Sequence, residues 1–125
     1  MSPIHLPKTA LTPLVIFEPE ECILKLEGRM IPENVDAAFL PINQWIEDYL
    51  KEDKPLHILI RLYFYNSSSL KRLFTLCRKL DTHFNQGRRL SVIWEYEEGD
   101  ENSKTDIEEV FKGIGYPYQI VPVEV

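Results

Sequence analysis

Glycine and cysteine are both scarce in this sequence, with 5 and 2 residues among 125. A loop that holds a nucleotide through its backbone amides needs several closely spaced glycines, so a phosphate-binding loop of that kind is not expected. The cysteines, Cys22 and Cys77, lie far apart, and no C-x-x-C pattern or Cys/His cluster accompanies them. We therefore predict no zinc site and two free, buried thiols, with a disulfide between them as the alternative.

Positive charge is also in short supply, because 14 lysines and arginines face 20 aspartates and glutamates, for a net charge of -6. Nucleic-acid binding needs a basic surface that neutralises phosphates, so this balance argues against it. No apolar run approaches the length needed to cross a bilayer, and no membrane insertion is expected. The N-terminal segment contains three prolines and no continuous apolar stretch, so we expect no signal peptide and a cytoplasmic protein.

The sequence patterns of known catalytic sites are missing as well. There is no G-x-S-x-G, no H-E-x-x-H and no regularly spaced set of metal ligands. The three histidines, His5, His57 and His83, are scattered, and about 24 Å of helix would separate His83 from Ser67. We predict that the protein is not an enzyme and that it holds no metal or cofactor.

Hydrophobic periodicity predicts one domain over residues 1–125. The predicted strands are 12–19, 21–28, 55–65, 89–96 and 116–123, and the predicted helices are 32–52, 67–87 and 101–115. The first two strands form a hairpin that turns at Pro19 and Glu20, and helical crossovers make the later strands parallel. The predicted class is an α/β fold with three helices and a mixed, mostly parallel sheet of about five to six strands.

Three of these elements have more specific features. The strand at 55–65 is apolar on both sides, which predicts a central strand in a sheet covered on both faces. One of its sides is expected to hold Leu56, Ile58, Ile60, Leu62 and Phe64. The helix at 32–52 begins after the cap Asn34 and continues through Pro41 with a kink. The helix at 67–87 ends at Gly87, and its predicted buried stripe is Leu70, Leu73, Phe74, Cys77, Leu80 and Phe84.

Three serines at 67–69 follow the central strand and begin the second helix, and no acid lies in the helix's first turn. The amides of a first helical turn have no internal partner and attract negative charge. A phosphate on one of these serines would meet those amides and the nearby cations Lys71 and Arg72. The alternative is purely structural, with Asn66 or Ser67 capping the helix and the other hydroxyls facing solvent.

Charge is unevenly distributed along the chain. Residues 71–89 hold six basic residues and one acid, and residues 95–109 hold eight acids and one base. This indicates either two solvated faces or a partner surface with complementary charges. Asp100, Glu101 and Asp106 are interpreted as a flexible acidic loop rather than a cation site.

Four segments in this order resemble the SiaC family of small bacterial regulators: "IPEN" at 31–34, "PINQWIEDYL" at 41–50, "LYFYNSSSLK" at 62–71 and "WEYEEGDE" at 94–101. The resemblance extends from about Glu27 to Tyr118. It implies a STAS-like domain, similar to anti-sigma-factor antagonists, in which a phosphorylated hydroxyl starts a helix after a central strand.

The resemblance also implies a phospho-switch. A Ser/Thr kinase would add a phosphate, a metal-dependent Ser/Thr phosphatase would remove it, and the unmodified form would bind its target. In this family the implied target is a diguanylate cyclase, so the switch would set cyclic-di-GMP output and biofilm growth. The implied acceptor is Ser67, with Ser68 and Ser69 as alternates.

The expected partner surface combines the start of the second helix with the loop before the first. It comprises Pro32, Glu33, Asn34, Tyr65, Asn66, Ser68, Ser69, Lys71 and Arg72. Two alternatives to the switch remain: a constitutive interaction or dimerisation scaffold whose serines only cap, and a small-molecule-binding domain. The sequence leaves the oligomeric state and the identity of the partners open.

Overall fold

The computed structural model describes residues 3–125. The elements in chain order are β1 (His5–Leu6), β2 (Leu14–Glu18), β3 (Ile23–Met30), α1 (Val35–Tyr49), β4 (Leu56–Tyr65), α2 (Ser67–Asn85), β5 (Leu90–Glu97), α3 (Glu101–Phe111) and β6 (Tyr118–Val123). All six strands form one sheet in the order β1-β2-β3-β4-β5-β6. β1 and β2 run antiparallel to their neighbours, and β3 to β6 are parallel. The predicted α/β class with three helices and a mixed sheet is confirmed, and β1 is an addition to the predicted strands.

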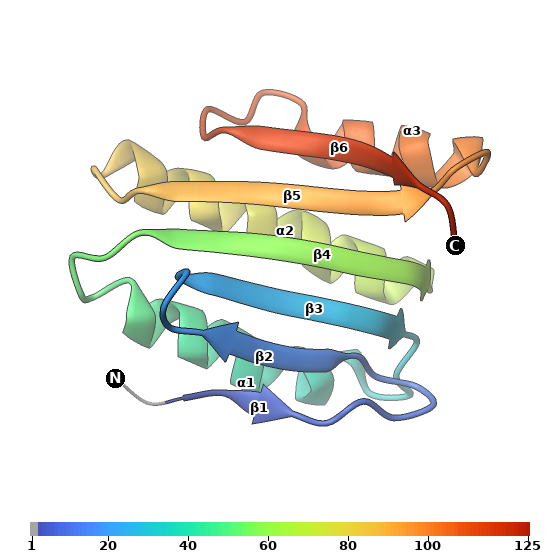
Figure 1. Cartoon of the computed structure of the whole chain (residues 1–125), viewed down its shortest axis with the longest axis horizontal. Helices are drawn as coiled ribbons and strands as arrows, with labels where there is room; N and C mark the ends of the chain where they lie inside the picture. Colours follow the sequence, from blue (N-terminus) through green and yellow to red (C-terminus); the bar gives the residue numbers. More distant parts are fainter. Residues whose placement is uncertain (1–2) are drawn as a thin grey trace.

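All three helices lie on one side of the sheet (Figure 1). Each parallel crossover moves one strand further in the same direction, and right-handed crossovers that do so place their helices on the same face. β4 is central, as predicted, but the prediction that both faces are covered is wrong. The sheet has a helix-covered face, which holds the core, and an open face.

The open face is only partly apolar. Along β4 the residues alternate between fully buried ones, which face the helices, and exposed or half-buried ones such as His57, Leu59 and Tyr63. Arg61 lies among them, with its Nε 2.9 Å from Glu95 Oε1 on β5 and its Nη1 3.4 Å from Glu27 Oε2 on β3. An aromatic side chain on this face therefore has carboxylates nearby, which disfavours contact with nucleic-acid phosphates.

A β-bulge at the end of β4 changes which side chains face the helices. Leu62 pairs with Gly28 and Phe64 pairs with the next residue, Arg29, so Tyr63 is an extra residue in β4. Phe64 is 59% exposed, with the Arg29 guanidinium 5.0 Å from its ring centroid, so its predicted place in the buried row is wrong. Tyr65, rather than Phe64, points toward the helix-covered face, where its ring lies near the Trp94 ring. The neighbouring strand β3 continues beyond Gly28 to Met30, two residues past its predicted end.

Helices α1 and α2 follow the prediction but differ from it in detail. α1 is one helix that continues through Pro41, although it ends at Tyr49 rather than at residue 52. In α2 the buried residues include Leu76, whereas Phe74 is 36% exposed and lies against the Arg78 guanidinium. Both helices bury their stripes against the sheet because the apolar positions recur at helical spacing.

The two cysteines are free. Cys77 is buried in α2, and this burial raises the pKa of its thiol to about 12. Cys22 is half-buried in the turn between β2 and β3. Among the described helices, none combines the length and the hydrophobicity required to cross a membrane.

Candidate functional site

The carboxyl ends of the parallel strands meet at one edge of the sheet, and each helix begins there (Figure 1). Met30 at the end of β3 pairs with Tyr65 at the end of β4. The amide of Asn66 donates to the Met30 carbonyl at 3.3 Å, so the chain after β3 and the start of α2 lie side by side. The fold thereby brings the loop at residues 31–34 next to the serines.

Asn66 is the N-cap of α2. Its backbone is extended, and its side-chain oxygen accepts a hydrogen bond from the Ser69 amide at 2.9 Å. Of the two candidate caps considered from the sequence, Asn66 therefore performs the role. The hydroxyls of Ser67 and Ser68 are not needed for capping, and both residues are exposed.

Ser69 differs from its two neighbours because it is completely buried. Its Oγ has no hydrogen-bond partner among the described residues. A kinase could not reach this hydroxyl without unwinding the first turn of α2. The geometry therefore argues against Ser69 as a phosphate acceptor and as a direct partner contact.

The first turn of α2 contains no acid, and two cations follow it. Lys71 is exposed and makes no ion pair within residues 3–125. Arg72 pairs through Nη2 with Asp36 Oδ1, which lies in the first turn of α1. Unpaired first-turn amides and a free ammonium form an environment that favours an added phosphate group.

The start of α1 lies across from the start of α2. Asn34 caps α1 as predicted, and its side-chain oxygen accepts from the Ala37 amide at 3.1 Å. Glu33 and Asn34 are exposed, and Pro32 is half-buried. The Asp36–Arg72 pair ties the two helix starts together, so a partner could contact the Pro32–Asn34 loop and the start of α2 at once.

Tyr65, predicted as a partner contact, is directed toward the helices instead. Its ring lies 6.5 Å from the Trp94 ring, and its hydroxyl donates to Asp106 Oδ2 of α3 at 3.3 Å. Burial is the main cause that raises the pKa of Tyr65, and the Asp106 carboxylate adds to it. Tyr65 thus links β4 to α3 more than it presents a surface.

α3 begins at Glu101, as predicted, but the role of Asp100 just before it was missed. Asp100 caps α3 by accepting from the Ser103 amide at 3.1 Å and from the Ser103 hydroxyl at 2.7 Å, so it is not part of a flexible loop. These hydrogen bonds lower the pKa of Asp100. A shallow groove of about 320 Å³ separates this cap from the bulged end of β4 at Tyr63 and Phe64. The available signal was an aspartate directly before the predicted helix at 101–115, since Asp is a preferred N-cap residue.

The histidines lie apart from one another. His57 Nδ1 is 2.5 Å from Ser91 Oγ on the open face, and His83 Nε2 is 3.4 Å from Glu47 Oε1 between α1 and α2. Within residues 3–125 no group of three or more histidines, cysteines or carboxylates is arranged to hold a metal ion. The features that gather at the carboxyl edge are exposed hydroxyls, helix amides, the cations Lys71 and Arg72 and several carboxylates, and the serine end of this edge suits phosphate and protein contacts.

Comparison with known proteins agrees with this arrangement. A family model described as SiaC family regulatory phosphoprotein matches residues 6–123. An uncharacterized protein of Pseudomonas aeruginosa (strain UCBPP-PA14) is 29% identical over 121 residues, which are 96% of each chain. The structure of SiaC of Pseudomonas aeruginosa matches with a TM-score of 0.88 and 27% identity, over 98% of this chain and 100% of that one.

A third match is a crystal structure of the diguanylate cyclase SiaD in complex with its activator SiaC from Pseudomonas aeruginosa. It has a TM-score of 0.88 and 27% identity, over 96% of this chain and 99% of the matched chain. Because the family model spans nearly the whole sequence and the fold agrees from end to end, this chain belongs to the SiaC family of regulatory phosphoproteins.

Proposed function

We propose that this protein is a non-enzymatic regulator whose binding to a diguanylate cyclase is gated by phosphorylation of Ser67. The observation that carries the proposal is the start of α2, where an exposed hydroxyl adjoins an acid-free helix turn and the Pro32–Asn34 loop. A relative with the same fold is described as the activator of a diguanylate cyclase and forms a complex with it.

The chemistry of the switch follows from charge. The unmodified helix start is neutral at its hydroxyls and electropositive at its amides. A phosphate adds nearly two negative charges at pH 7 and three strong acceptor oxygens. Lys71 lies four residues after Ser67, on the same side of the helix, and would pair with this phosphate. A partner that binds the unmodified helix start would then face the negative charge of the phosphate, which weakens its binding.

The proposal requires two further proteins. A Ser/Thr kinase adds the phosphate, and a metal-dependent Ser/Thr phosphatase removes it, so the ratio of the two activities sets the fraction of active regulator. All these partners would act in the cytoplasm. Residues 1–125 would serve as one regulatory domain whose own contribution is protein contact rather than catalysis.

The proposal is tested first by phosphopeptide mass spectrometry on protein isolated from its native cells in several growth states. A condition-dependent phosphate on Ser67 supports it, and a phosphate on Ser68 would move the acceptor by one residue. No phosphate in any growth state would favour the constitutive scaffold, for which the open sheet face offers a second surface.

Binding of the purified cyclase by titration calorimetry provides the second test. Ser67→Ala should bind with unchanged affinity regardless of kinase treatment, and Ser67→Asp should bind about tenfold more weakly because a carboxylate now stands at the interface. Ser68→Asp, with the same charge one residue along, shows whether the effect depends on position. Loss of binding by Ser67→Ala would mean that the hydroxyl itself is a contact.

A further inference from the structure

Helices α1 and α2 enclose a groove that begins beside the serines. It has a volume of about 250 Å³, and its walls include Phe39 and Leu40 of α1 and Thr75 and Leu76 of α2. Both helices start at the carboxyl edge of the sheet, so one end of this groove lies at the candidate site (Figure 1).

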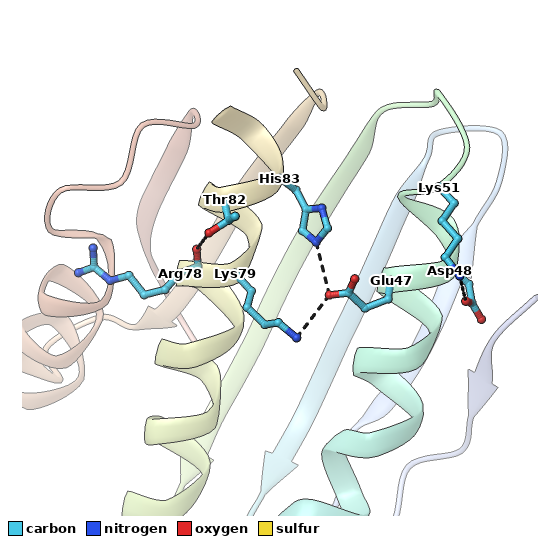
Figure 2. A network of polar contacts seen from close by, with 7 residues as sticks. All are labelled: Glu47, Asp48, Lys51, Arg78, Lys79, Thr82 and His83. Atoms are coloured by element: carbon cyan, nitrogen blue, oxygen red, sulfur yellow. Dashed lines mark hydrogen bonds and ion pairs between the residues drawn. The ribbon is translucent and has the colours of Figure 1, made fainter. Parts of the chain in front are cut away.

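Ion pairs cross the groove at both ends. At the serine end Arg72 of α2 pairs with Asp36 of α1. At the far end Glu47 of α1 accepts from Lys79 and His83 of α2, each at 3.4 Å, and its carboxylate points between the two (Figure 2). The two helices are therefore linked across the groove at each end, and the Asp36–Arg72 link is the one at the serine end.

Helix geometry places Lys71 beside both exposed serines and Arg72 beside Ser68 but not Ser67. Side chains three and four residues apart on a helix are neighbours, so Ser67 lies next to Lys71, and Ser68 lies next to Lys71 and Arg72. Lys71 makes no ion pair within the described residues, whereas Arg72 is already engaged by Asp36. A phosphate on Ser67 could bind Lys71 without disturbing another contact, whereas a phosphate on Ser68 also has the guanidinium of Arg72 within reach.

The link at Arg72 is suited to exchange. The side chains of Arg72 and Asp36 are 45% and 73% exposed, and ion pairs in such positions contribute little to stability. Both a carboxylate and a phosphate can bind a guanidinium bidentately, and a phosphate dianion binds it more strongly because it carries more charge. Once Arg72 has moved, Asp36 also faces a nearby like charge.

We propose that Arg72 is a positioning residue that couples a phosphate on Ser68 to the start of α1. When Ser68 is phosphorylated, Arg72 leaves Asp36 for the phosphate, and the first turn of α1 with its Pro32–Asn34 loop loosens. A phosphate on Ser67 pairs with Lys71 and leaves the link intact. This inference rests on the proposed function, since it assumes that the serines at the start of α2 are modified.

The test uses the full chain with phosphoserine incorporated during synthesis at position 68 or 67, so that no kinase is needed. Amide hydrogen exchange is followed by NMR at Ala37 and Ala38, whose amides bond the side-chain and backbone oxygens of Asn34 at 3.1 Å each. Phosphoserine at 68 should accelerate exchange of both amides about threefold, within the range expected when one exposed ion pair is lost. Phosphoserine at 67 should change it by less than about twofold.

Three variants separate the role of Arg72 from a general charge effect. Asp36→Asn should reproduce the acceleration without any phosphate, because it removes the same link. Arg72→Gln should do likewise, and phosphoserine at 68 should add nothing further to it. Lys71→Gln removes an equal charge from the adjacent position and should leave the α1 amides unchanged.

The proposal is overturned if phosphoserine at 68 leaves the exchange of Ala37 and Ala38 unchanged, or if it acts equally in the Arg72→Gln background. Either result would leave the gating by Ser67 untouched. Conversely, a failure to find any phosphate in cells would remove the proposed function without altering the exchange measured on the synthetic phosphoprotein.

Discussion

At the scale of single residues, the four polar side chains at the start of α2 have separate tasks. Asn66 caps the helix, Ser67 and Ser68 face solvent, and Ser69 is enclosed. A tract of identical serines thus contains two exposed hydroxyls and one inaccessible hydroxyl. Because Asn66 caps the helix, the hydroxyls of Ser67 and Ser68 remain available for modification or for contact with other proteins.

Removal of this cap should lower stability. Asn66→Ala leaves the Ser69 amide without its acceptor, and we expect a loss of about 1 kcal/mol in the free energy of unfolding. Urea denaturation followed by circular dichroism measures it. Asn66→Asp retains an acceptor oxygen, and its free energy of unfolding should fall by only about 0.3 kcal/mol. Equal losses for the two variants would contradict the capping role.

Asp100 makes stability depend on pH in the acidic range. Its hydrogen bonds from Ser103 lower its pKa below the ordinary value of 3.8. Because the folded state holds the carboxylate in its charged form, this contribution is complete above the unfolded pKa. It is lost as the pH falls through the folded value.

Asp100→Asn preserves an acceptor for the cap but does not titrate. Its stability near pH 7 should lie within about 0.5 kcal/mol of the unmodified protein, and its decline below about pH 4 should be shallower. Thermal unfolding from pH 2 to pH 7 compares the two. Parallel curves would show that Asp100 does not contribute to acid sensitivity.

At the scale of secondary-structure elements, the bulge in β4 connects the sheet to α3. The extra residue Tyr63 shifts the alternation, so Tyr65 rather than Phe64 reaches the helix side. Bulges redirect side chains in this way at the ends of strands and near functional edges. Here the redirected tyrosine binds Asp106 and packs against Trp94, next to the candidate site.

Tyr65→Phe tests this connection. The variant keeps the ring against Trp94 but removes the hydrogen bond to Asp106, and it should lose about 1 kcal/mol in the free energy of unfolding. Tyr118→Phe is the matched control, since Tyr118 is exposed and its hydroxyl has no hydrogen bond among the described residues. A Tyr65→Phe variant as stable as the control would show that the aromatic packing alone fixes Tyr65.

At the scale of the whole molecule, the one-sided placement of the helices leaves a broad open face with few free charges at its centre. Arg61 pairs with both Glu27 and Glu95 across three adjacent strands, and the Lys25 ammonium lies 3.5 Å from Glu18 Oε1. The guanidinium between them offsets much of the charge repulsion between Glu27 and Glu95. Much of the net charge of -6 lies elsewhere, including the acids of the α3 region.

Arg61→Met retains the apolar stem and removes the charge that joins the three strands. We expect a loss of about 1 kcal/mol in the free energy of unfolding, measured in urea at low salt. Adding Glu95→Gln to this variant should recover part of the loss, because the remaining glutamate no longer faces a like charge. Lys25→Met removes only the single ion pair with Glu18, and this variant should lose less stability. No recovery in the double variant would mean that packing, not charge, sets the cost.

Much of this protein follows from its sequence. The helix and strand periodicities, the cap Asn34, the stop at Gly87, the parallel crossovers and the class of the fold depend on neighbours within a few residues, so a local pattern is enough to predict them. The acid-free start of α2 is likewise visible in the sequence.

Other features were decided only by the tertiary structure. A helix-crossover pattern is compatible with helices on one or both faces of a sheet, and the order of the strands in space selected one face. The bulge that exchanged Phe64 for Tyr65 depends on the register between β3 and β4. The link from Arg72 to Asp36 joins residues more than thirty positions apart in the sequence. The burial of Ser69 depends on the side chains that pack around it. Such contacts have no local signature, because they arise only when separate elements meet.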